Sequence, residues 1–358
     1  MPTTPLPAPP AASRDLSLKI LRTLEGNQAF CVPTLALALG ALSLGADDLL
    51  GSQIEELVGS LDFWKTFSLE GEEGGPTVEK SLSLWTDGRT PVNPRFIGEV
   101  KSTFDALVKA TDFRGKAQKE ISDFVAQATH DLILGFGESV PTTTESMLLS
   151  TLFFKGLWQT QFSKAKTQDL PFDAATEVVR VPTMMKHFKS REARLARNEK
   201  NQILQLPYVG DRYNAYFVLP NDLDQFLAAP SWREAVGPCE FFYGQGGIKV
   251  ELPKFKLETT LMLSEKLETL GLTALSASGH LDGIHPGFFA ANVLQKNVVI
   301  VDEEGTEAAS VTGILMMRSA SIAPPPEIIK FDRPFIFVIR DEVSGADLFV
   351  ATIRNPAQ

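Results

Sequence analysis

Residues 302–326 read DEEGTEAASVTGILMMRSASIAPPP and connect two apolar stretches, NVVIV (297–301) and FIFVIR (335–340). Connections in compact domains are usually about four to six residues long, so this segment is exceptional. Small residues occupy alternate positions in its first half, at Thr306, Ala308, Ser310 and Thr312. Side chains of an extended chain point alternately to opposite faces, so such a segment can slide between two existing strands with little steric conflict.

The second half of the same segment has the composition of a protease cleavage site. Arg318 is followed by Ser319 and Ala320 and preceded by two methionines. An arginine followed by small residues is a good substrate for a trypsin-like protease, and exposed loops are where proteolysis concentrates. A surface loop without a specific function fits the same composition, so the flanking sequence has to decide between the two interpretations.

The start of the segment resembles the proximal hinge of inhibitory serpins. It carries an acidic pair, a glycine, a threonine, a third glutamate and paired alanines, at Glu303, Glu304, Gly305, Thr306, Glu307, Ala308 and Ala309. Five further segments resemble strands of the same family in the family's order: SMLLSTLFFKGLWQTQF (146–162), VPTMMKHF (181–188), LPKFKLETT (252–260), FDRPFIFVIRD (331–341) and LFVATIRNP (348–356). The spread of these matches predicts one serpin domain over residues 16–358, preceded by a disordered arm over residues 1–15.

The resemblance implies an α+β, single-domain serpin fold with three β-sheets, eight to nine helices and an exposed reactive-centre loop at about residues 303–326. Patterns in the residues point the same way. Helical spacing dominates up to about residue 134, with helices expected at 16–24, 35–44, 52–67, 94–111 and 118–134, whereas most segments from residue 146 onward are strand-like. Helices first and strands later, without βα alternation, indicate an α+β fold with large sheets.

The resemblance also implies a function: suicide-substrate inhibition of a trypsin-like serine protease, with the clotting proteases among the candidate targets. Most family members would place the cut bond after Ser319, and a minority one residue earlier, after Arg318. A guanidinium pairs far better than a hydroxyl with the carboxylate of a trypsin-like specificity pocket, so Arg318–Ser319 is the expected reactive bond. The alternative is a non-inhibitory serpin that acts as a hormone carrier, an angiotensinogen-like prohormone precursor or a chaperone.

Four residues outside the loop are expected, from the resemblance, to control opening of the main sheet. Lys254 should form an ion pair with Glu303 where the hinge enters the sheet, with Trp158 close by. Ser150 and Gln295 stand where the family usually has an asparagine and a histidine that are hydrogen bonded to each other. We expect Ser150 and Gln295 to make a replacement contact that retunes opening.

Other features of the chain narrow the function. The formal net charge of −10 disfavours general affinity for nucleic acid, and no apolar run is long enough to span a membrane. The chain has no Gly-x-Ser-x-Gly turn and no phosphate-binding glycine loop, so we expect no enzymatic activity. Its four histidines and two cysteines are scattered, which disfavours a metal site, and Cys31 and Cys239 could form one disulfide or remain as two free thiols.

Cofactors and location are less constrained by the residues. We expect no cofactor, because a glycosaminoglycan site is not supported by a clear basic cluster. Lys101, Lys109, Arg114, Lys116 and Lys119 fit a solvated helix face better than a polyanion site. Residues 1–15 lack the apolar core of a signal peptide, so the chain is expected to be either cytosolic, or extracellular with its signal peptide removed. It is expected to be a monomer.

Overall fold

The strands of the chain form three sheets, and the computed structural model describes residues 11–357 apart from residues 70, 72, 134–139, 291 and 307–323. The described residues also form nine α-helices: α1 (Ala11–Leu21), α2 (Val32–Ser43), α3 (Asp48–Val58), α4 (Leu61–Thr66), α5 (Pro94–Phe104), α6 (Ala117–Ala128), α7 (Leu223–Ala228), α8 (Trp232–Val236) and α9 (Ser264–Thr269). A short 3-10 helix, η1, spans Lys164–Lys166. The expected α+β architecture of three sheets and eight to nine helices is confirmed for this part of the chain.

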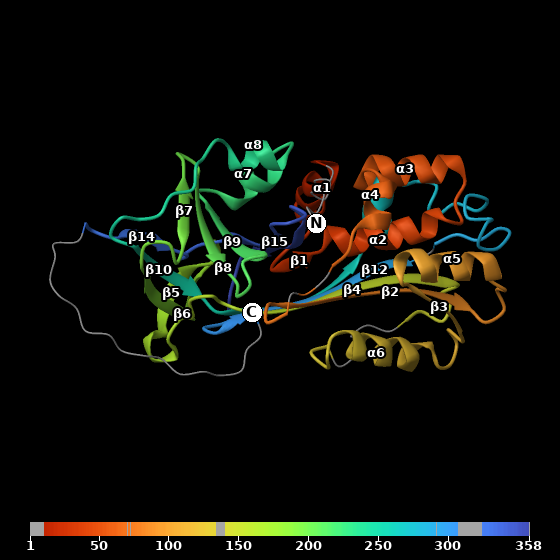
Figure 1. Ribbon diagram of the computed structural model, residues 1–358. Helices are drawn as coiled ribbons and strands as arrows, with labels where there is room; N and C mark the ends of the chain where they lie inside the picture. Colours follow the sequence, from red (N-terminus) through yellow and green to blue (C-terminus); the bar gives the residue numbers. More distant parts are fainter. Residues whose placement is uncertain are drawn as a thin grey trace.

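The largest sheet, here called the main sheet, has its six strands in the order β11 (Phe255–Met262), β12 (Asn292–Val301), β13 (Gly305–Thr306), β4 (Ser146–Leu157), β2 (Thr77–Asp87) and β3 (Leu107–Thr111). β4 lies at its centre and is buried along almost its whole length. A strand covered on both faces reads as a continuous apolar run, which explains the sequence SMLLSTLFF. In Figure 1 the helices α2–α5 lie on one side of this sheet and α6 on the other.

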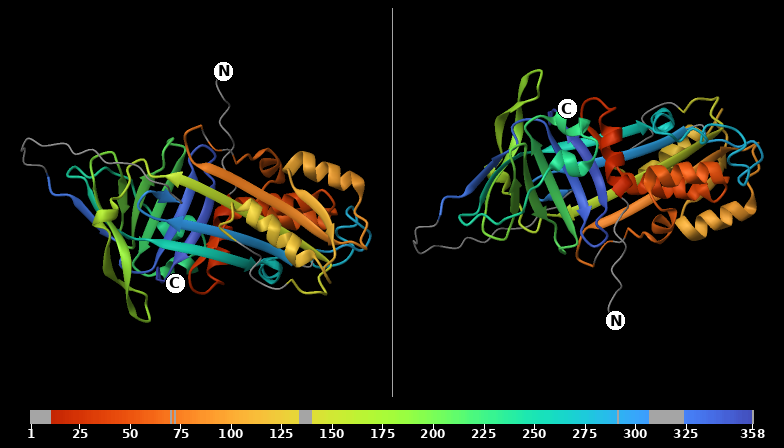
Figure 2. Two further views of the ribbon diagram at one scale, coloured as in Figure 1. Left: turned by 90° about the horizontal axis from the view of Figure 1, so that it is seen from below. Right: turned by 90° about the horizontal axis from the view of Figure 1, so that it is seen from above.

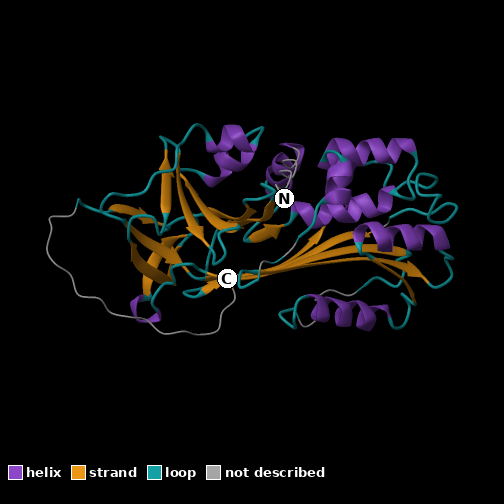
Figure 3. Ribbon diagram, viewed as in Figure 1, coloured by secondary structure: helices purple, strands orange, loops and turns teal. Residues whose placement is uncertain are grey.

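Two further sheets complete the fold. The second sheet is antiparallel throughout, in the order β1 (Gln28–Phe30), β16 (Asp347–Ile353), β15 (Phe335–Asp341), β9 (Tyr213–Pro220), β8 (Asn201–Pro207) and β7 (Arg194–Arg197). The small sheet has the order β14 (Glu327–Lys330), β10 (Ile248–Pro253), β6 (Val178–Phe188) and β5 (Gln168–Asp173). Figures 2 and 3 show the molecule as elongated, with most helices gathered around the main sheet and the small sheet at the opposite end.

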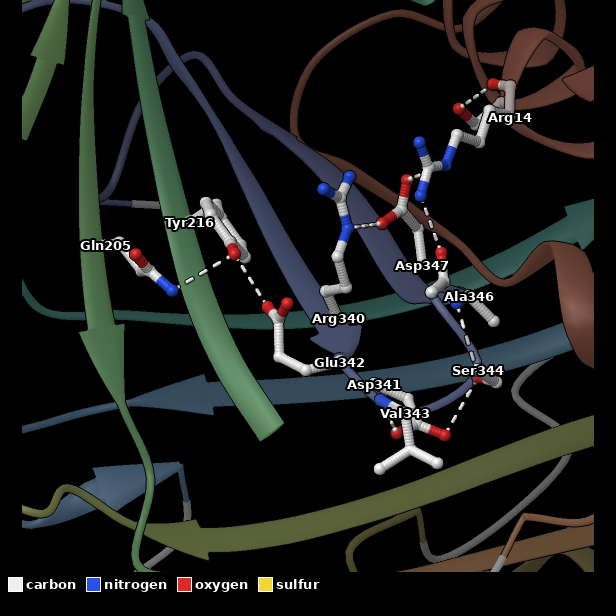
Figure 4. A network of polar contacts seen from close by, with 12 residues as sticks. Arg14, Gln205, Tyr216, Arg340, Asp341, Glu342, Val343, Ser344, Ala346 and Asp347 are labelled. Carbon is white, nitrogen blue, oxygen red and sulfur yellow. Dashed lines mark hydrogen bonds and ion pairs between the residues drawn. The ribbon is translucent and has the colours of Figure 1, made fainter. Parts of the chain in front are cut away.

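The first helix begins earlier than the sequence predicts. α1 starts at Ala11, so the described part of the expected arm, residues 11–15, is helical, while residues 1–10 lie outside the described residues. Arg14 Nη2 donates a hydrogen bond to Gly345 O (2.7 Å) on the turn between β15 and β16. Asp347, the first residue of β16, accepts from Arg340 Nε (2.5 Å) and lies 3.7 Å from Arg14 Nε (Figure 4). These polar contacts tie the start of α1 to the hairpin.

Three other boundaries differ from the expected ones for local reasons. The helix expected at 52–67 is divided into α3 and α4 by Gly59, whose positive φ of 81° ends the first helix. The helix expected at 94–111 ends at Phe104, and residues 107–111 instead form β3, which pairs in parallel with β2. The helix expected at 118–134 ends at Ala128. For residues 107–111, apolar spacing over five residues does not distinguish a strand from a helical turn. The available pairing with β2 explains why this segment is a strand.

Candidate functional site

The hinge residues form a tight turn that leads the chain back into the main sheet. Asp302 N donates to Gly305 O (3.0 Å), and Asp302 Oδ1 accepts from the backbone N–H groups of Glu304 (2.9 Å) and Gly305 (3.2 Å). β13 therefore follows β12 directly as its antiparallel partner, with Val301 opposite Thr306. The carboxylate of Asp302 satisfies backbone donors that the turn would otherwise leave free.

β13 enters the sheet between β12 and β4. Gly305 and Thr306 pair antiparallel with residues 157 and 156 of β4. Farther along, β12 and β4 pair directly with each other in parallel, over residues 292–297 and 147–152. The seam between these two strands is thus separated at one end by the hinge and closed at the other.

Close backbone approach explains why glycine stands at the start of β13. A Cβ on Gly305 would lie 2.0 Å from the carbonyl oxygen of Gly156, a distance at which no side chain fits. Both residues belong to motifs that the sequence identifies, Gly305 to the hinge and Gly156 to the FFKGLW segment. The two glycines allow Gly305, the first residue of β13, to pack closely against β4.

Glu303 is held by two side chains at the point of insertion. Its Oε2 lies 2.8 Å from Lys254 Nζ, and its Oε1 accepts from Thr167 Oγ1 (2.6 Å). The predicted contact between Lys254 and Glu303 is therefore formed. The Glu303 side chain is only 3% exposed, and burial alone would raise the pKa of its carboxyl group. The hydrogen bonds from Lys254 and Thr167 outweigh burial, so this pKa lies below its ordinary value.

Trp158 lies against the hinge turn, as expected. Its indole Nε1 donates to Asp302 O and its backbone N–H donates to Glu304 O, both at 2.9 Å. Its ring stacks on Tyr208, with centroids 4.6 Å apart and ring planes 16° from parallel. The hydroxyls of Tyr208 and Thr306 are hydrogen bonded to each other (2.7 Å), and both residues are buried. The side chain of Thr306 is thus on the inward face, as the alternation of small residues predicts.

Three residues of this site were not identified from the sequence: Tyr208, Thr167 and Lys164. Lys164, in η1, forms an ion pair with Glu304 Oε1. Tyr208 lies in a short bridge opposite Trp158, and Thr167 directly follows η1. Each is more than ninety residues from the hinge in sequence, and none belongs to a pattern that distinguishes it from other surface or core residues.

The contact expected between Ser150 and Gln295 is not made, although the two residues are register partners on β4 and β12. The Gln295 amide is committed elsewhere: Oε1 accepts from Cys31 N (2.8 Å), and Nε2 donates to Cys31 O (2.7 Å) and Thr34 Oγ1 (3.0 Å). Cys31 and Thr34 belong to the start of α2, so Gln295 ties β12 to that helix. The glutamine side chain is long enough to extend to the start of α2, where it hydrogen bonds to the buried backbone N–H and carbonyl groups of Cys31 instead of to Ser150.

A family model described as "Serpin (serine protease inhibitor)" matches residues 11–356. The chain is a serpin. Iripin-8 of Ixodes ricinus is 32% identical over 279 residues, which are 73% of this chain and 68% of that protein. Leukocyte elastase inhibitor of Bos taurus is 31% identical over 302 residues, 79% of each chain.

Solved structures agree on the fold. The structure of human thyroxine-binding globulin complexed with thyroxine superposes with a TM-score of 0.83 at 22% identity, over 97% of this serpin and 98% of that chain. A relative by sequence is thus named as an elastase inhibitor, and the same fold occurs in a protein that binds thyroxine. Membership of the family fixes the fold of this chain and leaves its own activity to be argued from its residues.

The remaining predicted loop residues, Glu307, Ala308, Ala309, Arg318 and Ser319, lie outside the described residues. The structure brings together the other hinge residues with Lys254 and Trp158 at one end of the seam, while Ser150 and Gln295 lie farther along it. Cys31 and Cys239 are free thiols, which decides between the two states left open by the sequence.

The basic side chains of the α6 region have acidic neighbours. Lys109 and Lys116 lie 3.5 and 3.8 Å from the carboxylate oxygens of Glu120, and Lys119 lies 2.6 Å from Asp123. Such pairing lowers the local positive charge, as expected of a solvated helix face. No helix among the described residues of this serpin combines the length and the apolar character needed to cross a membrane.

Proposed function

We propose that this serpin is a suicide-substrate inhibitor of a trypsin-like serine protease. The observation that carries the proposal is the position of β13, whose two residues already separate β12 from β4 at the hinge end of the seam. A strand that continues from Thr306 along the same line would replace the direct pairing of β12 with β4. The small residues Ala308, Ser310 and Thr312 suit that path because they would face the crowded interior of the sheet.

The proposed reaction begins with the protease's serine oxygen attacking the carbonyl carbon of Arg318. The peptide bond to Ser319 breaks, the new α-amino group of Ser319 leaves, and an ester joins Arg318 to the protease. The freed loop then extends β13 through the seam and carries the acyl-enzyme with it. A strand of about 15 residues, at ~0.5–1.5 kcal/mol net per hydrogen bond, supplies on the order of 10 kcal/mol for deforming the bound protease.

Arg318 is proposed to occupy the specificity pocket of the target. A trypsin-like pocket ends in a carboxylate, and a guanidinium pairs with it through two parallel hydrogen bonds. The competing register, with cleavage after Ser319, would place a small hydroxyl in that pocket and lose this pairing. Clotting proteases are trypsin-like, so we propose them as the narrower target class, met by a monomeric serpin outside the cell and without a cofactor.

A gel experiment tests the proposal directly. Incubated with trypsin, the wild-type serpin should give an SDS-stable band near the sum of the two masses. Arg318→Ala should lose this band because the pocket pairing is lost, whereas the matched variant Arg318→Lys should keep it because the pocket also accepts lysine. Sequencing of the released fragment should begin at Ser319.

Two outcomes would contradict parts of the proposal. A fragment that begins at Ala320 would show that the cut follows Ser319 and that the register is wrong. A wild-type chain that is cut at Arg318 but forms no stable complex would favour the non-inhibitory alternative, a carrier, a prohormone precursor or a chaperone. The thyroxine-binding relative supports the carrier form of that alternative.

A further inference from the structure

Three consecutive carboxylates, those of Asp302, Glu303 and Glu304, lie within the hinge turn, and each has a different partner. Asp302 caps the turn's own backbone, and Glu303 is paired with Lys254. Glu304 is also buried, with its side chain 8% exposed. Three like charges in one turn repel one another, and a buried carboxylate without a cation is strongly unfavourable. Glu304 therefore depends on a cation of its own.

Lys164 is that cation. It lies in η1, on the connection from β4 to β5, and its ammonium group forms an ion pair with Glu304 Oε1. The pairing raises the pKa of Lys164 above its ordinary value, chiefly through the hydrogen bond to Glu304. Lys254 is already occupied by Glu303, so within the described residues no second ion pair to Glu304 is formed.

The backbone around Glu304 shows what this ion pair holds in place. Glu304 O accepts from Trp158 N, and Glu303 O accepts from Phe162 N, so the turn is attached to the segment between β4 and η1. Gly305, the next residue, begins β13 in the seam. A Glu304 side chain that moved out to solvent would pull on this turn and on the two residues that pair with β4.

We infer that Lys164 is a positioning residue for loop insertion. By holding Glu304 in the turn, it keeps Gly305 and Thr306 paired in the seam, so that the inserted strand extends from a turn that is already formed. The inference rests on the proposed inhibitory function and adds to it a residue that acts on the rate of insertion. Insertion competes with hydrolysis of the acyl bond, so a slower start releases more protease and leaves more of the serpin cleaved without a complex.

The variant Lys164→Met removes the charge and keeps the length of the side chain. Two measurements follow its effect: hydrogen exchange of peptides covering residues 302–306 and 157–163, and the stoichiometry of inhibition of trypsin. We expect faster exchange in both peptides and a rise in the stoichiometry of about two- to fivefold, the range that partly exposed ion pairs produce. Lys164→Arg should restore both values because it restores the cation.

Two further variants separate positioning from a general effect of charge. Lys166→Met removes a neighbouring exposed lysine of η1, for which the described residues show no ion pair, and should match the wild type in both measurements. Glu304→Gln combined with Lys164→Met removes the buried charge together with its partner. This double variant should recover most of the wild-type stoichiometry, because no carboxylate is left unpaired.

The exchange measurement does not require a protease, which keeps the inference and the proposed function distinguishable. Wild-type exchange and stoichiometry in Lys164→Met would overturn the inference and leave the proposed function intact. Equal effects in Lys164→Met and Lys166→Met would also overturn it, because charge alone would then account for them. Failure of the wild type to form any complex would overturn the proposed function, and hydrogen exchange would still report whether Lys164 holds the turn.

Discussion

The carboxylate of Glu303 shows how a charge can be kept inside the main sheet. Its Oε2 forms the ion pair with Lys254, its Oε1 accepts from Thr167, and the backbone carbonyl of Glu303 accepts from Phe162 N. Lys254 lies between β10 of the small sheet and β11 of the main sheet, so the ion pair attaches the hinge to the junction of these two sheets. Removing one partner of such a pair leaves the other without compensation, which costs more than the pair contributes.

Glu303→Lys should make the serpin polymerise on storage. The substitution places a second ammonium group beside Lys254, and the repulsion should separate the strands at the hinge end of the seam. An opened seam can accept the loop of a second molecule as a strand. Native gels after prolonged warming should show a ladder for this variant and none for Glu258→Lys, which makes the same charge change at an exposed position of β11. A Glu303→Lys protein that stays monomeric would contradict the prediction.

Acidification should loosen the hinge through the same carboxylate. The folded-state pKa of Glu303 is lower than its unfolded value, so its ionised form stabilises the native state above about pH 4.3. This contribution falls as the pH drops through the lower, folded-state pKa. The melting temperature of wild type should therefore drop more steeply than that of Glu303→Gln below about pH 4. Parallel melting curves for the two proteins across this range would exclude the effect.

At the scale of elements, Gln295 connects β12 to α2, the helix that packs behind the main sheet. Three of the hydrogen bonds of its side-chain amide go to residues 31 and 34, and a fourth is accepted from Asn297 Nδ2 on β12 itself. Strand β12 must separate from β4 if a loop is to enter, and α2 fixes the position of β12. The tie therefore resists lateral movement of β12 during opening.

Gln295→Ala should lower the free energy of unfolding by about 1–3 kcal/mol, because it leaves the backbone N–H of Cys31 buried without a partner. The carbonyl oxygen of Cys31 keeps the N–H of Leu35 as its donor (3.4 Å). Denaturant unfolding followed by tryptophan fluorescence would measure the loss. Gln28→Ala is the matched control, since Gln28 lies on neighbouring β1 and makes one exposed hydrogen bond to Glu25 O. A loss below about 0.5 kcal/mol would show that water replaces the glutamine amide without penalty.

The sequence identifies those parts of the site that are encoded in contiguous segments. Strand β4, the hinge and the Lys254 segment each carry their pattern locally, so their pairing in register brings Lys254 and Trp158 to Glu303. No such local pattern predicts the ion pair of Lys164 with Glu304, because η1 and the hinge are far apart in the sequence and come together only in the folded structure. Whether Gln295 binds Ser150 or the start of α2 likewise depends on the length and conformation of its side chain, which the spacing of residues in the sequence does not reveal.

At the scale of the whole molecule, α6 covers the seam through which the loop is proposed to pass. Its apolar face, including Ile121 and Val125, packs with Met147 of β4 and Leu294 of β12 in one cluster. Figure 1 shows the helix lying across this face of the sheet. The two strands can therefore move apart only if their side chains shift beneath α6, which would resist opening before cleavage. The intact fold is proposed to be held short of its most stable arrangement.

The melting temperature of the loop-cleaved serpin, compared with that of the intact serpin, tests this account most directly. Cleavage within the reactive loop should raise it by at least about 10 °C, because an additional strand on the order of 10 kcal/mol is gained. Calorimetry on protein nicked in the loop by a protease that is not trypsin-like and is therefore not trapped, with the cut site verified by sequencing, would give the value. A melting temperature of the nicked protein equal to or below that of the intact protein would contradict insertion and the inhibitory mechanism built on it.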